Sequence, residues 1–165
     1  MIKMYIKTLD KKLLTLLILA LIAAGTICGK NTYTVCLIYS HFPCMYLNNI
    51  YLLLLYQQMD KFNSLHHLII TRIGNDKFYL YSYFLTISNA LIYNIVIYVT
   101  YYFYFGSIPK ETVSLTFFFM ILNLVIACIE NTIIYMQLGK KKQFIYLVLP
   151  IVINLLFHII FTDLF

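Results

Sequence analysis

The sequence predicts an all-α membrane protein with about five transmembrane helices and one short interfacial helix on the cytoplasmic side. Its composition, its apolar segments and the placement of its basic residues each favour this fold class. Of the 165 residues, 62% are hydrophobic and 11% are charged, and the mean hydropathy is +0.85. Soluble domains are typically about half apolar. We therefore expect one compact transmembrane domain over residues 1–165.

Apolar segments of the length needed to cross a bilayer, about 20 residues in a helix, recur along the chain. The expected spans are 13–28, 33–56, 78–104, 113–136 and 144–161. Pro43 predicts a kink in the second span because proline lacks a backbone N–H. The first span is also compatible with a cleaved signal peptide, since a Lys-rich start precedes it and Ala23, Ala24 and Gly25 form a small-residue site.

The basic residues divide unequally between the two sides of these spans. Ten of the twelve fall on the side of the N-terminus, and only Lys30 and Lys110 fall on the other. Cytoplasmic loops of membrane proteins are enriched in Lys and Arg. We therefore expect a multi-pass protein of the bacterial plasma membrane, with its N-terminus in the cytoplasm and its C-terminus outside. This placement also accounts for the net charge of +6 without a nucleic-acid partner.

Residues 57–77 form the one substantial polar segment, and they carry an apolar face at helical spacing. The residues of this face are Phe62, Leu65, Leu68 and Ile69. Asp60 or Asn63 is a candidate N-cap, and Gly74 is a candidate C-cap, with Asn75 or Asp76 as an N-cap for the following helix. The pattern predicts a short amphipathic helix at about 60–74 that lies on the cytoplasmic membrane surface.

Three ionisable residues within the spans mark a candidate intramembrane polar site. Glu130 lies in the inner half of the fourth span, and His41 and His158 lie in the outer halves of theirs. An intramembrane carboxylate is costly, so it indicates either a functional site or a polar partner on a neighbouring helix. Zinc sites need three or four converging ligands, and neither a His-x-x-x-His nor a Cys-x-x-Cys spacing occurs. No metal site is expected.

The chain carries no phosphate-binding loop, nucleotide fingerprint or hydrolase signature. We therefore expect no cofactor and no enzymatic activity in this chain, and any ATPase activity would belong to a partner subunit. Two alternatives stay open. His41 and Cys44 have the spacing of a Cys–His intramembrane peptidase, and Cys28 and Cys36 flank an outer turn where a disulfide would form in an oxidising compartment.

Arg72 and Gly74 lie at the end of the expected interfacial helix, and Lys77 lies between it and the third span. With this arrangement residues 65–99 resemble the ABC exporter permeases of the type-2 class, above all the small, divergent Firmicute members tied to bacteriocin and antimicrobial-peptide export or immunity. Those proteins have an Arg-x-Gly-like turn and a basic residue at this point. The closing pair of spans, 113–161, with an inner Gly-Lys turn fits the same pattern. The chain departs from the family in having five expected spans where six are usual.

The resemblance implies a non-catalytic permease-type subunit that exports a peptide or hydrophobic substrate. Its partners would be an ABC ATPase, a second membrane subunit or a second copy, and membrane lipid. The interfacial helix would be the coupling helix that contacts the ATPase through Phe62, Leu65, Leu68, Arg72 and Gly74. The alternative is a non-transport membrane protein, such as an immunity or regulatory subunit, that binds a peptide or a partner membrane protein.

Overall fold

The computed structural model describes residues 2–28 and 42–164, and within these ranges every regular element is a helix. The all-α prediction is thereby confirmed. In chain order the elements are α1 (Ile2–Lys7), α2 (Lys11–Ile27), the π-helix η1 (Phe42–Asn48), α4 (Asn49–Ser64), α5 (His66–Ile73), α6 (Asn75–Phe105), the 3-10 helix η2 (Lys110–Thr112), α7 (Val113–Tyr135) and α8 (Ile145–Leu164).

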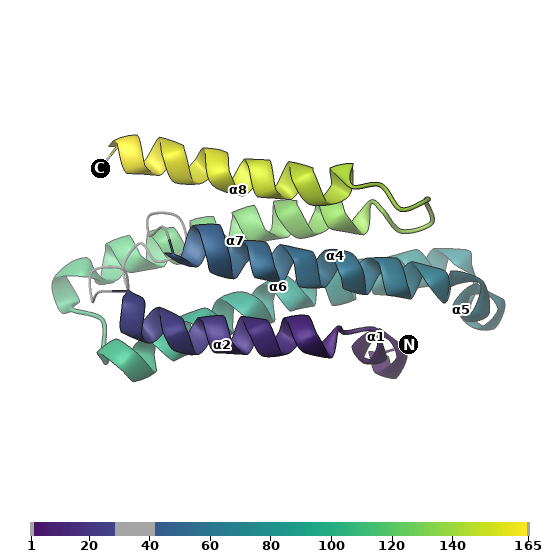
Figure 1. Ribbon diagram of the computed structural model, residues 1–165, viewed down its shortest axis with the longest axis horizontal. Helices are drawn as coiled ribbons and strands as arrows, with labels where there is room; N and C mark the ends of the chain where they lie inside the picture. The colour runs from purple at the N-terminus through teal and green to yellow at the C-terminus, as the bar shows by residue number, and fades with distance from the viewer. Residues whose placement is uncertain (1, 29–41, 165) are drawn as a thin grey trace.

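The long helices form an elongated bundle. Figure 1 shows α2, α4, α6, α7 and α8 running side by side along the long axis, with α1 and α5 at one end. α6 packs most extensively on α7, and α4 contacts α2, α7 and α8. α4 therefore lies in the middle of the bundle, where it can pair polar groups with several helices.

Among the described residues, two helices have the length and composition of membrane spans. They are the 31-residue helix Asn75–Phe105 and the 26-residue stretch Lys110–Tyr135, and Ile145–Ile160 is a shorter apolar helix. They coincide with the third, fourth and fifth expected spans. A helix of about 20 residues crosses the hydrocarbon core of a bilayer at 1.5 Å per residue, so both of the longer ones can reach across it.

The bundle places polar side chains inside and large apolar side chains outside. Exposed Leu, Ile, Val and Phe residues cover the outer faces of α2, α6, α7 and α8. The buried polar residues of the last three helices are Ser82, Thr86, Asn94, Thr116, Asn123, Glu130, Asn131, Asn154 and His158. Contiguous apolar surface on this scale is rare in soluble monomers, and the arrangement suits a lipid environment.

The polar segment 57–77 differs from the prediction. α4 runs without interruption to Ser64, and Asp60 and Asn63 lie within it, so neither caps a helix. Asp60 accepts a hydrogen bond from Lys142 Nζ, and Asn63 Oδ1 accepts one from the backbone N–H of Gly139. These partners come from the α7–α8 loop, far away in the sequence, so the neighbouring residues could not predict them. Because Asp60 and Asn63 lie within α4, the predicted N-cap is wrong.

Gly74 ends α5 as predicted. Its φ is 84°, in a region that favours glycine, and its N–H donates to the carbonyl of Ile70 at 2.9 Å. α6 begins at the next residue, Asn75, and neither Asn75 nor Asp76 caps it. One glycine thus separates the short α5 from the long α6 and lets the chain change direction between them.

The second expected span is described only from Phe42 onward. Its first regular element is the π-helix Phe42–Asn48, which contains Pro43 near its start. Proline removes one helical hydrogen bond, so the irregular helix agrees with the predicted distortion. The expected His41 site, Cys36 and the start of this span lie outside the described residues.

Candidate functional site

The basic residues gather at one end of the bundle. Figure 1 places α1, the start of α2, α5, the start of α6 and the α7–α8 loop at the same end, and the connection between α6 and α7 at the other. All ten basic residues predicted to share one side belong to these segments or to the end of α4. Lys110 lies in η2 at the opposite end, and Lys30 is outside the described ranges.

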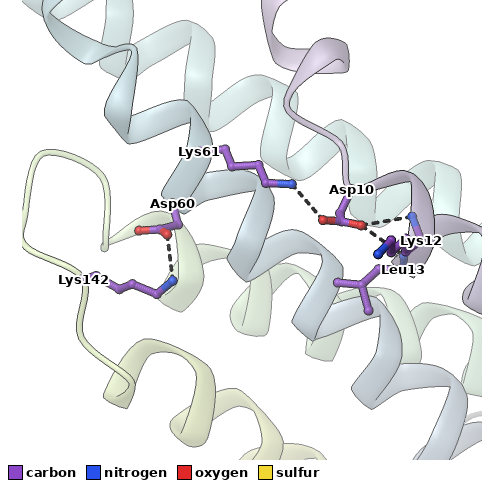
Figure 2. A network of polar contacts seen from close by, with 6 residues as sticks. All are labelled: Asp10, Lys12, Leu13, Asp60, Lys61 and Lys142. Carbon is purple, nitrogen blue, oxygen red and sulfur yellow. Dashed lines mark hydrogen bonds and ion pairs between the residues drawn. The ribbon is translucent and has the colours of Figure 1, made fainter.

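Two ion pairs hold this basic end together, as Figure 2 shows. Lys61 Nζ lies 2.8 Å from Asp10 Oδ2, and Lys142 Nζ lies 2.8 Å from Asp60 Oδ2. Asp10 also caps α2, because its Oδ1 accepts from the backbone N–H of Lys12 at 3.0 Å. The start of α2 and the α7–α8 loop are thereby both fixed to the end of α4.

These pairs shift the titration of the groups that form them. The hydrogen bond from Lys61 is the main cause that lowers the pKa of the Asp10 carboxyl, and the N–H of Leu13 adds to it. The hydrogen bond to Asp60 raises the pKa of the Lys142 ammonium. Exposed pairs of this kind contribute little to stability. Their effect is to fix the relative positions of the segments that they join.

α5 lies at this basic end and presents an open face. Leu68 is 62% exposed and Arg72 is also exposed. Arg72 forms no ion pair with any residue in the described ranges. The opposite face packs inward through Ile69, which is buried, and through the His66 ring, whose centroid lies 4.9 Å from that of Phe78. α5 is therefore fixed on one side and available on the other.

Phe62 does not share this open face. It is 0% exposed, in edge-to-face contact with Tyr5 at 5.2 Å between ring centroids and stacked on Phe78 at 5.5 Å. Its predicted role as an accessible docking anchor does not fit this position. Leu65 is partly buried at the junction of α4 and α5. Of the expected apolar anchors, Leu68 is the one fully available to a partner.

Glu130 lies inside the bundle and not on its apolar outer surface. It is 1% exposed, and its Oε1 has no hydrogen-bond partner among the described residues. The adjacent Asn131 donates to the Tyr51 hydroxyl on α4 at 2.7 Å and to the Thr86 carbonyl on α6 at 3.0 Å. Glu130 thus sits beside the junction of α4, α6 and α7, a helix–helix interface as its charge predicted.

A second group of polar contacts joins α6 and α8 to the start of α4. Asn48 Nδ2 donates to Asn154 Oδ1 at 3.0 Å, and the Tyr93 hydroxyl donates to Asn48 Oδ1 at 2.8 Å. The rings of Tyr51 and Tyr93 stack with centroids 3.9 Å apart and an interplanar angle of 2°. This stack links the two groups into one polar seam, defined as Asn48, Tyr51, Tyr93, Asn131 and Asn154.

Sequence reasoning gave Tyr51, Tyr93 and Asn154 no role. The available signal was a polar group within an apolar helix, because such groups need partners inside a membrane. Tyr51 and Tyr93 did not stand out as such groups, because tyrosine is abundant near the span ends and this favoured an interfacial position. The seam became visible only once α4, α6 and α8 were placed together.

Of the three residues of the expected intramembrane site, the structure describes Glu130 and His158, and it does not bring these two together. His158 is buried on α8, and His41 lies outside the described ranges. α7 and α8 run antiparallel through a short loop (Figure 1), with Glu130 near that loop and His158 far from it. At 1.5 Å per residue they are about 12 Å apart along the bundle.

The chemistry of this site is not assigned by a bound-metal geometry among the described residues, and it is not assigned by similarity to a known protein. Among the side chains that the structure describes, no three from His, Cys, Asp or Glu residues lie close enough to hold a metal ion. No protein-family model, curated protein or solved structure matches this chain. The function must therefore be argued from the bundle, its basic end and the polar seam.

Proposed function

We propose that this chain is an integral membrane protein that acts as a non-catalytic, permease-type subunit of an ABC exporter. The observation that carries the proposal is α5, a short helix with an open face of Leu68 and Arg72 at the basic end of an apolar bundle. A permease must receive work from a soluble ATPase, and a fixed helix at the cytoplasmic membrane face is suited to transmit it. The resemblance of residues 65–99 to type-2 permeases supports the same role and favours a peptide or hydrophobic substrate.

The outer surface and the placement of the charges support the membrane location. Apolar side chains cover the outer faces of the long helices, while polar ones lie inside. The ten basic residues at one end match the enrichment of Lys and Arg on the cytoplasmic side. Figure 1 shows the N-terminal helix at this basic end, and α8 running toward the other. We infer five spans in the bacterial plasma membrane, with the N-terminus inside and the C-terminus outside.

A reporter at each end of the chain tests this topology. An alkaline phosphatase fused after residue 165 is expected to be active, because that enzyme folds only outside the cytoplasm, and a fusion before Met1 is expected to be inactive. Cysteine labelling by a membrane-impermeant reagent provides an independent measurement. A C-terminus that reads as cytoplasmic would require an even number of spans and would refute the five-span arrangement.

The coupling role predicts which face of α5 the ATPase contacts. Exposed aliphatic and Arg residues are typical anchors of interfaces, and α5 offers Leu68 and Arg72 one helical turn apart. We expect the double variant Leu68→Asp and Arg72→Glu to lower the yield of co-purified ATPase at least tenfold. The ATPase is identified by mass spectrometry through its Walker A sequence, after affinity purification of the tagged chain from membranes.

Ile2→Asp with Lys3→Glu is the matched control for this variant. Ile2 is 61% exposed and Lys3 is also exposed at the same end of the bundle, but both belong to α1, so the same change in charge there should leave the ATPase yield unaltered. Recovery of the ATPase at wild-type yield with the α5 double variant would exclude the coupling role. If the wild-type chain instead co-purifies with a membrane protein and with no ATPase, the immunity or regulatory alternative replaces the permease.

A further inference from the structure

A groove of about 330 Å³ lies between α2, α4 and α6, and its walls are almost entirely apolar. Among the residues that line it are Leu14, Ile18 and Leu21 of α2, Leu54 of α4, and Ile92 and Val96 of α6. The four of these that are exposed are Leu14, Ile18, Ile92 and Val96. The groove therefore opens sideways, toward the surface that would face lipid.

Polar side chains near the basic end of the groove already satisfy one another. Asn89 Nδ2 donates to the Tyr5 hydroxyl at 2.9 Å and to Gln58 Oε1 at 3.3 Å, and Gln58 Nε2 donates to the Tyr5 carbonyl at 3.1 Å. Gln58 and Asn89 line the groove. Since their hydrogen bonds are made within the protein, the part of a ligand that enters the groove should be apolar.

The volume of the groove suits a hydrocarbon chain. The α2 side of the lining runs from Leu14 to Leu21, about 10 Å at 1.5 Å per residue, and Leu9 continues it ahead of the helix. A single hydrocarbon chain is thin enough to enter, and the volume lies at the lower end of the range of about 300–1,000 Å³ for ligand pockets.

Basic residues continue the lining of the groove toward the cytoplasmic end. Lys11 precedes Leu14 and Ile18 by three and seven residues, so it extends the same face of α2. Asp10 is committed to Lys61 and to the start of α2. Lys11 and Lys12 form no ion pair within the described ranges. The groove therefore ends beside Lys11, and Lys12 follows it in the chain, so that both cations are available to an anionic group.

We propose that this groove binds one acyl chain of an anionic phospholipid whose phosphate contacts Lys11 and Lys12. The inference rests on the proposed membrane location and not on the export role. The apolar walls bind the chain through van der Waals packing, because an acyl chain within a bilayer is already out of water. The lysines supply the preference for negative charge, in the way that basic residues near a membrane surface attract anionic lipids.

The test uses the full chain reconstituted in phosphatidylcholine vesicles that contain a trace of spin-labelled lipid. Phosphatidylglycerol and phosphatidylcholine labels with identical acyl chains are compared by the fraction that the protein immobilises. We expect the wild type to bind phosphatidylglycerol at least threefold more strongly. The double variant Lys11→Gln and Lys12→Gln should lose this preference, and Ile18→Trp, which fills the opening of the groove, should lower the immobilised fraction of both lipids.

Two controls separate the groove from the general lipid-facing surface. Lys110→Gln removes a charge at the opposite end of the bundle, and Leu19→Trp enlarges an exposed side chain of α2 that does not line the groove. Both should behave as the wild type. Equal immobilisation of the two labels by the wild type, or an equal effect of Ile18→Trp and Leu19→Trp, would overturn the inference. A chain that fails to float with the vesicles would instead contradict the membrane location itself.

Discussion

Replacing Glu130 by Lys is expected to prevent the bundle from assembling. Glu130 is 1% exposed beside the junction of α4, α6 and α7. A lysine there would place a longer, positively charged side chain in a site that contains unpartnered acceptors but no carboxylate to pair with. A buried ammonium without a carboxylate partner is strongly destabilising, by about 3–5 kcal/mol, and the loss of packing adds to this. We expect at least a hundredfold loss of folded, monodisperse protein in detergent. The measurement is size-exclusion chromatography of wild-type and variant protein, each solubilised from the same amount of membrane.

Glu130→Gln is the matched variant, because the amide keeps the shape of the side chain and adds hydrogen-bond donors. Those donors can serve the unpartnered Oδ1 of the neighbouring Asn131. We expect its thermal midpoint in detergent to stay within a few degrees of the wild type. A Lys variant that is recovered in the same yield as the Gln variant would mean that Glu130 does not face the helix–helix interface.

Replacing Phe62 by Ala is expected to destabilise the basic end of the bundle by about 3–5 kcal/mol, the usual range for removal of a buried aromatic ring. Phe62 is 0% exposed and contacts the rings of Tyr5 and Phe78. Its loss leaves a cavity between α1, α4 and α6. The measurement is the free energy of unfolding in a mixed-micelle denaturant titration. A large decrease in thermal stability should accompany it.

Leu68→Ala provides the comparison. Leu68 lies six residues after Phe62 and is 62% exposed, so its truncation should change the free energy of unfolding by less than about 0.5 kcal/mol. The two variants therefore separate folding from docking, since only Leu68 should affect an ATPase partner without affecting stability. Equal destabilisation by both variants would show that α5 is packed on both faces, in conflict with an open docking face.

The ends of several helices could be read from the sequence with little error. The expected spans 78–104, 113–136 and 144–161 compare with Asn75–Phe105, Val113–Tyr135 and Ile145–Leu164. Each long apolar run here is bounded by glycine, proline or charged residues. These local signals set both the length and the limits of a helix.

The boundary between α4 and α5 could not be read in this way. Polar residues from Gln58 onward looked like the end of a helix, yet α4 continues to Ser64. Gln58, Asp60 and Asn63 hydrogen-bond Tyr5, Lys142 and Gly139, which lie 53, 82 and 76 residues away in the chain. Because these partners satisfy the polar groups within the bundle, local polarity did not mark the point where the helix ends.

The sequence by itself determined the helical class, most of the helix limits, the shared end of the basic residues and the presence of a costly carboxylate at position 130. Composition and the spacing of apolar residues are properties of the local sequence, so they are enough to predict features of this kind. The tertiary structure alone decided that Phe62 is buried while Leu68 is exposed, and that Tyr51, Tyr93 and Asn154 join one polar seam. The physical reason is that helical spacing shows which residues share a face, whereas only the neighbouring helices determine what covers that face.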